Sequence, residues 1–317
     1  MNRRRSRRGV PAATGPLWAL LVAACLLATG APAGAQDLEP KAYSASPAGA
    51  AFLVLGLARS SGSVVSDPTL PLTDVEASIN AGLAATGYTF GLFDKLALVT
   101  ATLPYSWGDI SGRVFEEARA VTRSGLADAR FKLSINLAGN PAVGAREFAR
   151  TPRRTILGTS LTVTAPSGQY DGAKLINLGT NRWAFKPEVG VAVPKGRWDF
   201  DAYLGVWLFT DNADFYPGGR TRSQAPVVAV QGHGSYTFRP RLWLAIDATW
   251  YHGGDAQIDG GEPSGGMNNS RLGATLSLPA GRQQSFKVAY SSGVSVRTGT
   301  NFRTLSVGWQ WLRFTKL

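Results

Sequence analysis

The sequence is poor in cysteine, and this scarcity excludes several kinds of chemistry. Cys25 is the single cysteine among 317 residues. It lies in an apolar segment, from Leu17 to Ala28, that follows five arginines and precedes the small residues Ala33 and Ala35. This order is typical of a secretory signal peptide, with cleavage expected after Ala35. The mature chain would then contain no disulfide, no thiol nucleophile and no cysteine-based metal site.

Two alternatives to an ordinary signal peptide are suggested by this leader segment. The run from Val22 to Cys25 is similar to a lipoprotein cleavage box, but Leu26 and Leu27 continue the apolar stretch where a lipoprotein turns polar. Paired arginines suggest twin-arginine export, but Gly9 and Val10 are not the apolar residues expected after such a pair. We therefore expect a signal peptide at 1–35 and one exported domain at 36–317.

Long hydrophobic runs are also missing from the mature chain. After Gln36, no window approaches the roughly 18–20 uncharged apolar residues that a membrane helix needs. If this part of the chain spans a membrane, it must do so as a closed β-barrel, because only a barrel or a helix satisfies every backbone hydrogen bond in lipid.

A surplus of positive charge is present but modest. The formal net charge is +12, and five arginines with no acid lie before Gln36, which leaves +7 for the mature chain. Nucleic-acid binding needs lysine and arginine gathered on one face, whereas these charges are spread along the sequence. We expect no nucleic-acid partner.

Apolar and polar residues alternate with a period of two through most of the mature chain. Phe131, Leu133 and Ile135, for example, alternate with Arg130 and Lys132. The pattern predicts an all-β fold, an antiparallel transmembrane β-barrel of about 12 strands, each near the ten residues that a tilted membrane strand needs. The expected strands are 50–58, 75–89, 95–106, 126–138, 155–165, 181–193, 198–209, 225–238, 242–252, 269–278, 285–296 and 303–313.

The connections between these strands support a barrel. Tight turns at 91–94, 194–197, 239–241 and 279–284 alternate with long polar connections. Short turns at one end and long loops at the other are the asymmetry of outer-membrane barrels. The connection 139–154 is long where a short turn is expected, and we predict a small helix near 143–148.

Aromatic residues near strand ends predict girdles at the membrane interfaces: Tyr105, Trp107, Trp183, Trp198, Tyr236, Phe238, Trp243, Trp250, Tyr251, Trp309 and Trp311.

The alternation also predicts which side chains enter the barrel. The apolar phase, such as Leu133 and Val191, should face lipid, and the polar phase should face the lumen. The charges of both signs predicted in the lumen can either pair structurally or line a path for a solute. These lumenal residues are Glu76, Asp128, Arg130, Lys132, Arg182, Lys186, Glu188, Asp199, Asp201, His233, Asp247, Arg271 and Lys287.

Enzymatic motifs are missing from the sequence. No Walker, Rossmann, H-E-x-x-H or G-x-S-x-G pattern occurs, and we expect no cofactor, no metal and no catalysis. His233 and His252 fall on opposite phases, so they should not converge on a metal. A three-residue turn at 239–241 would place His233 opposite Asp247, with Ser235 on the same face. These are the residue types of a nucleophilic triad, and the alternative is a structural His and Asp pair.

Several short motifs resemble those of a known family. They are Asp37-Leu38-Glu39-Pro40, Ser124-Gly125-Leu126-Ala127-Asp128, Pro166-Ser167-Gly168-Gln169-Tyr170 and Asn181-Arg182-Trp183-Ala184-Phe185-Lys186-Pro187-Glu188. Together they resemble the outer-membrane proteins associated with meta-pathway phenol degradation, over nearly the whole mature chain. The resemblance implies a transporter-like barrel in the outer membrane of a Gram-negative bacterium, with uptake of aromatic or hydrophobic compounds.

The sequence departs from barrel proteins at its end. Such proteins usually finish on an outward aromatic residue that the barrel-assembly machinery reads. Here Trp309 and Trp311 are on the outward phase, whereas Phe314 is on the inward phase. Either the strand ends near Trp311 or a bulge returns Phe314 to the outward phase.

The expected partners are outer-membrane lipid, the assembly machinery and a small organic solute. The alternatives to a channel are an outer-membrane hydrolase resembling a lipase and a sealed barrel that binds partners at its surface.

Overall fold

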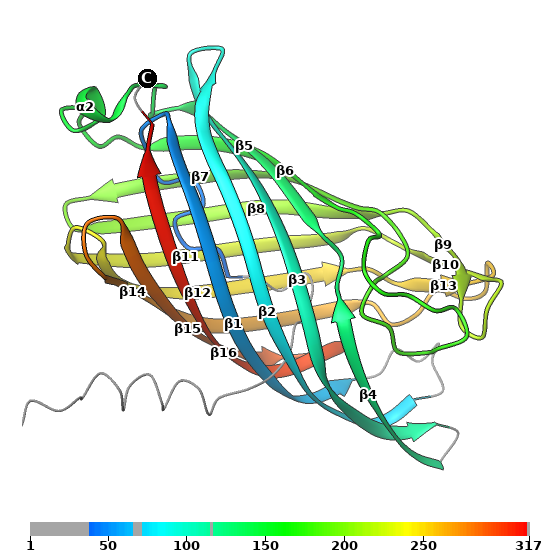
Figure 1. Cartoon of the computed structure of the whole chain (residues 1–317). Helices are drawn as coiled ribbons and strands as arrows, with labels where there is room; N and C mark the ends of the chain where they lie inside the picture. Colours follow the sequence, from blue (N-terminus) through cyan, green and yellow to red (C-terminus); the bar gives the residue numbers. More distant parts are fainter. Residues whose placement is uncertain (1–37, 66–71, 115–116, 316–317) are drawn as a thin grey trace, which may run out of the picture.

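The structure, a computed structural model, describes residues 38–65, 72–114 and 117–315, so the expected signal peptide lies outside the described residues. Nearly all of the secondary structure is β-strand (Figure 1). The elements are β1 (Ala50–Val65), β2 (Leu72–Leu92), β3 (Lys95–Val114), β4 (Glu117–Leu126), β5 (Arg130–Ala138), α2 (Ala145–Phe148), β6 (Ile156–Thr164), β7 (Ala184–Lys195), β8 (Trp198–Phe209), β9 (Asn212–Phe215), β10 (Arg220–Gln224), β11 (Val227–Arg239), β12 (Leu242–Gly253), β13 (Ala256–Ile258), β14 (Met267–Pro279), β15 (Gln284–Ser295) and β16 (Gly299–Phe314).

The strands close into an antiparallel barrel. The main sheet has 13 strands in the order β2-β1-β16-β15-β14-β12-β11-β8-β7-β6-β5-β3-β4, and the pairing of β2 with β3 closes it. β4 and β5 share one position in the wall, because both pair with β3: β5 pairs with its N-terminal part and β4 with its C-terminal part. The wall is therefore twelve strands around, as the alternation predicted.

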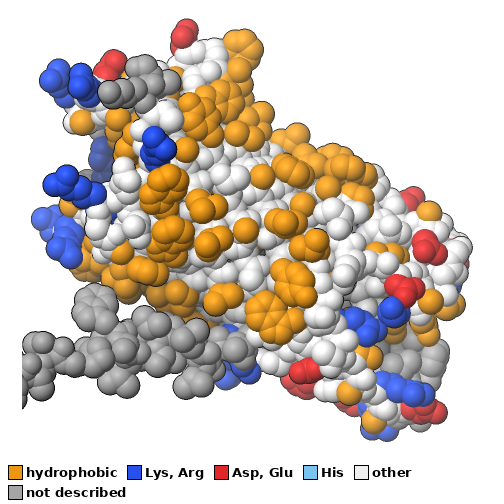
Figure 2. Space-filling model, in the orientation of Figure 1, with side chains coloured by type: hydrophobic (Ala, Val, Ile, Leu, Met, Phe, Trp, Pro, Cys, Tyr) orange, Lys and Arg blue, Asp and Glu red, His pale blue; other side chains and the backbone are white. Residues whose placement is uncertain are grey.

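The outer surface of the barrel carries a wide apolar band. Leu57, Leu133, Phe200 and Leu204 are among many large apolar side chains that are exposed there, and Figure 2 shows such side chains spread over the middle of the visible face. A surface of this kind is stable in hydrocarbon and costly in water. The fold is that of an outer-membrane barrel. Among the described residues, no helix has the length and apolar character to cross a membrane.

The two ends of the barrel differ as predicted. The turns between β2 and β3, β7 and β8, and β11 and β12 are tight, which marks the periplasmic end. The exception is the connection 139–155, which carries the short helix α2, as predicted. At the other end, β9, β10 and β13 form a separate small sheet from the long loops (Figure 1).

The first strands are longer than the sequence predicted. The segments 59–65 and 107–114 were expected to be loops, but they extend β1 and β3, and β4 is an additional strand. On the outward phase, these parts carry polar residues such as Arg59, Ser61, Asp109 and Ser111 in place of large apolar ones. They therefore lack the alternation of apolar and polar residues by which membrane strands are recognised.

The facing predicted for β2 is wrong. On β1, the exposed Leu53, Leu55 and Leu57 pair with Thr86, Ala84 and Gly82, so these residues of β2 face outward. Val75 and Ala77 are buried on the inner side with Ile110 and Phe302. Glu76, predicted in the lumen, is therefore exposed on the outer side. The small residues of β2 are similar on both faces, so their alternation gave the wrong phase.

Most of the predicted girdle residues do face outward, including Trp107, Trp198 and Trp250. The girdle prediction is wrong for Trp243 and Tyr251. Both lie on the lumenal phase of β12 with Ala245, which is fully buried. Trp309 lies opposite the outward Phe286, as predicted. β16 continues to Phe314 opposite Ala50 with no register shift, so Phe314 stays on the inner phase and no bulge restores it.

Candidate functional site

The lumenal surface of the barrel divides into two parts. The first, the uncharged half, consists of β16, β1, β2 and β3, and its inward phase contains only uncharged side chains such as Val54, Ala58, Ala81 and Leu83. The second, the charged half, runs from β5 through β6, β7, β8, β11, β12 and β14 to β15. Nearly all of the predicted lumenal charges lie on or beside this second half.

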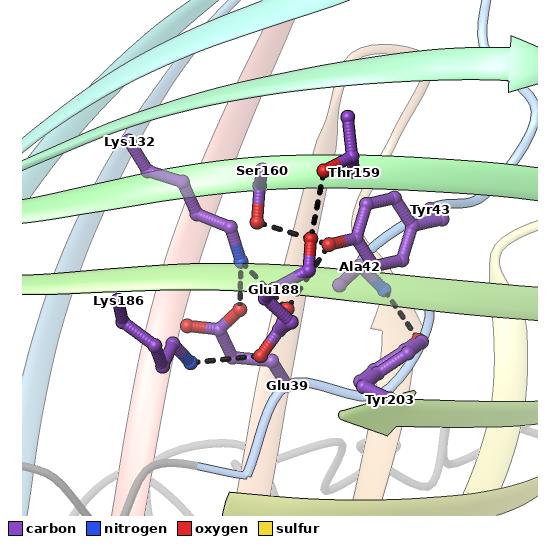
Figure 3. Close-up of polar contacts among 9 residues, drawn as sticks. All are labelled: Glu39, Ala42, Tyr43, Lys132, Thr159, Ser160, Lys186, Glu188 and Tyr203. Carbon is purple, nitrogen blue, oxygen red and sulfur yellow. Dashed lines mark hydrogen bonds and ion pairs between the residues drawn. The ribbon is translucent and has the colours of Figure 1, made fainter. Parts of the chain in front are cut away.

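A segment that precedes the first strand lies inside the barrel. This segment, Leu38–Ser46, is called the strap here. Glu39 of the strap forms an ion pair with Lys132 of β5, with 2.5 Å between Glu39 Oε2 and Lys132 Nζ. The same Lys132 Nζ lies 3.8 Å from Glu188 of β7, which also pairs with Lys186 at 2.9 Å. Figure 3 shows these four side chains converging between the strap and the wall. The predicted lumenal charges thus form a network that binds the strap.

Tyr43 is the most deeply buried anchor of the strap, with 1% of its surface exposed. Its hydroxyl lies 2.9 Å from the Ser160 hydroxyl and donates to Glu188 at 3.1 Å (Figure 3). The ring fits over two glycines: a Cβ added at Gly158 or Gly190 would lie 2.2 or 2.3 Å from ring carbons of Tyr43. Any larger residue at these two positions would displace the ring, so the wall is built to receive it.

The rest of the strap is held by further polar contacts. Lys41 pairs with Asp199 of β8 at 2.5 Å, and Asp199 also pairs with Arg153 from the periplasmic connection. The Ala42 amide donates to the Tyr203 hydroxyl at 3.0 Å. Asn140 donates to the Ser46 carbonyl at 3.1 Å. The barrel contributes side chains to these contacts. The backbone hydrogen bonds between its strands therefore do not depend on the strap.

Glu39 lies in a positively charged environment. The positive charge of Lys132, reinforced by Lys186, lowers the pKa of the Glu39 carboxyl to about 2. Burial raises the pKa of the Tyr43 hydroxyl, and the neighbouring Glu188 carboxylate raises it further. Glu39 is therefore an anion and Tyr43 a neutral hydroxyl donor when the strap is bound at neutral pH.

Asp128 is not part of the strap network. It lies in the three-residue break between β4 and β5, where its carboxylate accepts hydrogen bonds from Gly168 N at 2.9 Å, Thr180 N at 2.8 Å and Thr180 Oγ1 at 2.6 Å. Ser167 Oγ accepts a further bond from Ala129 N at 2.9 Å. These contacts fasten the long connection 165–183 to the break in the wall.

His233 and Asp247 lie directly opposite each other, as predicted. The three-residue turn is wrong, because Arg239 pairs with Leu242, and a register shift between Thr237 and Arg239 restores the predicted pairing. Their Nδ1 and Oδ1 atoms are 2.7 Å apart, and Thr275 donates to the other carboxylate oxygen at 2.9 Å. Ser235 Oγ is buried with no hydrogen-bond partner among the described residues. The geometry is that of the structural pair. No group of three or more His, Cys, Asp and Glu in the described part of the chain could hold a metal.

The remaining predicted lumenal residues lie on separate elements of the charged half or directly beside it. Arg271 is buried on β14 and donates to Ser291 Oγ and the Phe302 carbonyl, both at 3.0 Å. Lys287 on β15 extends over the Trp243 ring at 5.8 Å. Arg130 and Asp201 lie on the inward phases of β5 and β8, whereas Arg182 precedes β7, with its guanidinium 4.3 Å from the Phe209 ring centroid.

Sequence reasoning did not identify the strap residues Glu39, Lys41 and Tyr43 as part of the site. The strap has no periodic pattern, so nothing in it predicts a place inside the barrel. The available signal was Gly158 and Gly190, because a glycine within a strand often marks the close approach of another group.

Comparisons with known proteins agree with this architecture. An outer membrane channel from Pseudomonas putida F1 superimposes with a TM-score of 0.71 at 20% identity, over 87% of this chain and all of that one. The transport unit of the autotransporter AIDA-I from Escherichia coli gives a TM-score of 0.50 at 11% identity, over 93% of this chain and 97% of that one. Both likenesses show the fold. No curated protein matches the sequence. Residues 58–312 match the family described as the putative MetA-pathway of phenol degradation, and the chain belongs to that family.

Proposed function

We propose that this protein is a channel that carries small organic solutes with an apolar body across the outer membrane, and that the strap closes its lumen at rest. The observation that carries the proposal is the division of the lumen. The strap is fastened to the charged half, and the opposite wall offers Val54, Ala58, Ala81 and Leu83 to a solute. An apolar or aromatic body is stabilised on such a wall by removal from water.

Opening requires only that the strap leave its site. Its anchors are ion pairs and hydrogen bonds to side chains, at Lys132, Ser160, Glu188, Asp199 and Tyr203. Breaking them leaves the ladder of the barrel intact, and water can then solvate the released charges of the wall. The description of the family, which refers to phenol degradation, supports an aromatic solute.

The test is planar-bilayer conductance of the purified mature protein and of a variant lacking residues 38–46. We expect the deletion to raise single-channel conductance several-fold. Benzoate, an aromatic anion, should reduce the ion current of the open channel more than acetate does, because its ring occupies the uncharged half. A deletion variant that folds but conducts no better than the wild type would contradict the proposal and favour a sealed barrel.

A locked variant is the matched control. The mature chain has no cysteine, so Tyr43→Cys with Ser160→Cys provides one reactive pair between the strap and the wall. Joining them with a short, cleavable bifunctional thiol reagent should reduce the current below that of the same variant without reagent. Cleaving the reagent should restore it. A current that does not change on cross-linking would mean that the strap does not control the lumen.

A further inference from the structure

The periplasmic rim of the barrel is strongly basic. Exposed lysines and arginines occupy the tight turns, the connection 139–155 and the end of β16, so they surround the barrel. Figure 2 shows basic side chains gathered at the end that Figure 1 marks with α2 and the C-terminus. The basic rim, as this set is called here, consists of Lys95, Arg146, Arg150, Arg154, Lys195, Arg197, Arg239, Arg282 and Arg313.

Within the described part of the chain, these nine cations have no acidic partners. The exposed acids of the described rim are Asp94 and Glu147, and neither lies within salt-bridge distance of a cation. None of the nine forms an ion pair with another described residue. The extracellular end differs, because Lys174 pairs with Asp171 at 2.6 Å and Arg220 pairs with Asp259 at 2.7 Å.

A ring of like charges without counter-charges is self-repelling. Two other basic side chains at this end already have structural roles: Arg153 pairs with Asp199, and Arg241 donates to the Gly281 and Gln284 carbonyls. The nine rim cations make no such contacts, so their counter-charge must come from outside the described chain.

Exposed aromatic residues place the basic rim at the lipid boundary. Phe93, which is 87% exposed, lies two residues before Lys95, and Trp198 follows Arg197 directly. Phe238 lies directly before Arg239 and is exposed in the same way. Aromatic and basic side chains together mark the level of lipid headgroups.

We propose that the basic rim binds the phosphate groups of anionic phospholipids in the periplasmic leaflet of the membrane. Arginine presents a planar fork of donors that matches a phosphate, and lysine adds a point charge. The distribution favours lipid over an acidic protein, because a protein would cover one sector of the barrel, whereas headgroups surround it. This inference concerns the outside of the barrel and does not depend on solute passage.

The experiment compares lipid retention by the full mature chain and two variants. Each is placed in bilayer discs of phosphatidylethanolamine with equal amounts of phosphatidylglycerol and phosphatidylcholine, and the lipids retained on the released protein are counted by native mass spectrometry. The rim variant carries Lys195→Gln, Arg197→Gln, Arg239→Gln and Arg282→Gln. The control variant removes as many extracellular cations, with Arg119→Gln, Lys174→Gln, Arg220→Gln and Arg297→Gln.

We expect the wild type and the control variant to retain phosphatidylglycerol over phosphatidylcholine by at least about five-fold. The rim variant should retain the two almost equally, and added salt should weaken the preference of the wild type. A shift between folded and unfolded gel mobility on heating checks that each variant is folded. No preference in the wild type, or the same preference in the rim variant, would overturn the proposal. Binding of soluble polyglutamate without a lipid preference would overturn it in favour of an acidic protein.

Discussion

The two halves of the lumen are built from the same kind of strand, yet their inward side chains differ in charge. In the charged half, Lys132, Lys186 and Glu188 are each buried or nearly so, and they are stable there because they pair with one another and with the strap. In the uncharged half, the inward residues are uncharged and need no ion-pair partner. If the strap leaves its site as we propose, this difference lets the barrel hold a removable segment against one wall and leave the other wall free for an apolar solute.

The largest expected effect is the loss of the central carboxylate of the charged half. Glu188→Gln leaves Lys132 and Lys186 facing each other without their shared anion, and unpaired buried charge is costly. We expect the free energy of unfolding to fall by about 3 kcal/mol, measured by urea unfolding in lipid vesicles.

The matched change in the uncharged half is Ser106→Ala, which removes a buried hydroxyl that has no partner among the described residues. We expect a change within about 0.5 kcal/mol. Equal losses for Glu188→Gln and Ser106→Ala would remove the energetic distinction between the two halves.

The second prediction tests the facing of β2 in the uncharged half. Ala84 is exposed on the lipid side and Leu83 faces the lumen. Ala84→Asp should therefore lower the free energy of unfolding by about 2 kcal/mol, because the charge enters hydrocarbon. Leu83→Asp should cost less, since its carboxylate reaches the lumen. The opposite order would restore the phase that the sequence alone suggested.

The third prediction concerns pH and the hold of the charged half on the strap. The bound state lowers the pKa of Glu39 from 4.5 to about 2, so binding of the strap is strongest above pH 4.5 and weakens as the pH falls toward 2. Because 36% of the Glu39 side chain is exposed, solvent screening limits the effect to roughly a few-fold. The measurement is the fraction of time for which the channel is open as the pH is lowered from about 5 to about 3. We expect this fraction to rise.

Lys132→Gln is the control for this titration. Without the lysine, the pKa of Glu39 should return toward its ordinary value, and the open fraction should be higher at pH 5 and nearly constant down to pH 3. A wild-type channel that closes further as the pH falls would contradict the proposed sign.

The smallest expected effect is that of Ser235→Ala. His233 and Asp247 bind each other and Thr275, and Ser235 contributes no hydrogen bond to them. We expect unchanged conductance and no ester or phospholipid hydrolysis by either protein. Hydrolysis by the wild type that disappears in the variant would instead mean that the charged half contains an active site.

The sequence predicted the membrane-spanning parts well where large apolar residues alternate with charges. On β5, the large apolar residues Phe131 and Leu133 alternate with the charged Arg130 and Lys132. Only the apolar residues can face lipid, and the structure confirms this orientation. The register of His233 with Asp247 was also correct, although the turn assumed for it was one residue too long: Arg239 pairs with Leu242, and a register shift between Thr237 and Arg239 compensates. β2 was misread since alanine, glycine and threonine occupy both of its faces.

Two further features could not be predicted, because they depend on the tertiary structure. The extensions of β1 and β3 carry no membrane pattern, and the break before β5 is stabilised by Asp128 through contacts with 168 and 180, far along the chain. The strap is the clearest case. Its position is determined by Gly158, Gly190 and Glu188, none of which is near it in sequence.

The binding of Tyr43 also has a consequence for the order of folding. Its partners Ser160 and Glu188 lie 117 and 145 residues further along the chain. The strap, which leaves the ribosome before the first strand, therefore has no site to bind until β6 and β7 have paired. The barrel must assemble around an unattached N-terminal segment, and the segment inserts only as a late step. A slow final phase in refolding, present in the wild type and lost on deletion of 38–46, would be the kinetic signature of that insertion.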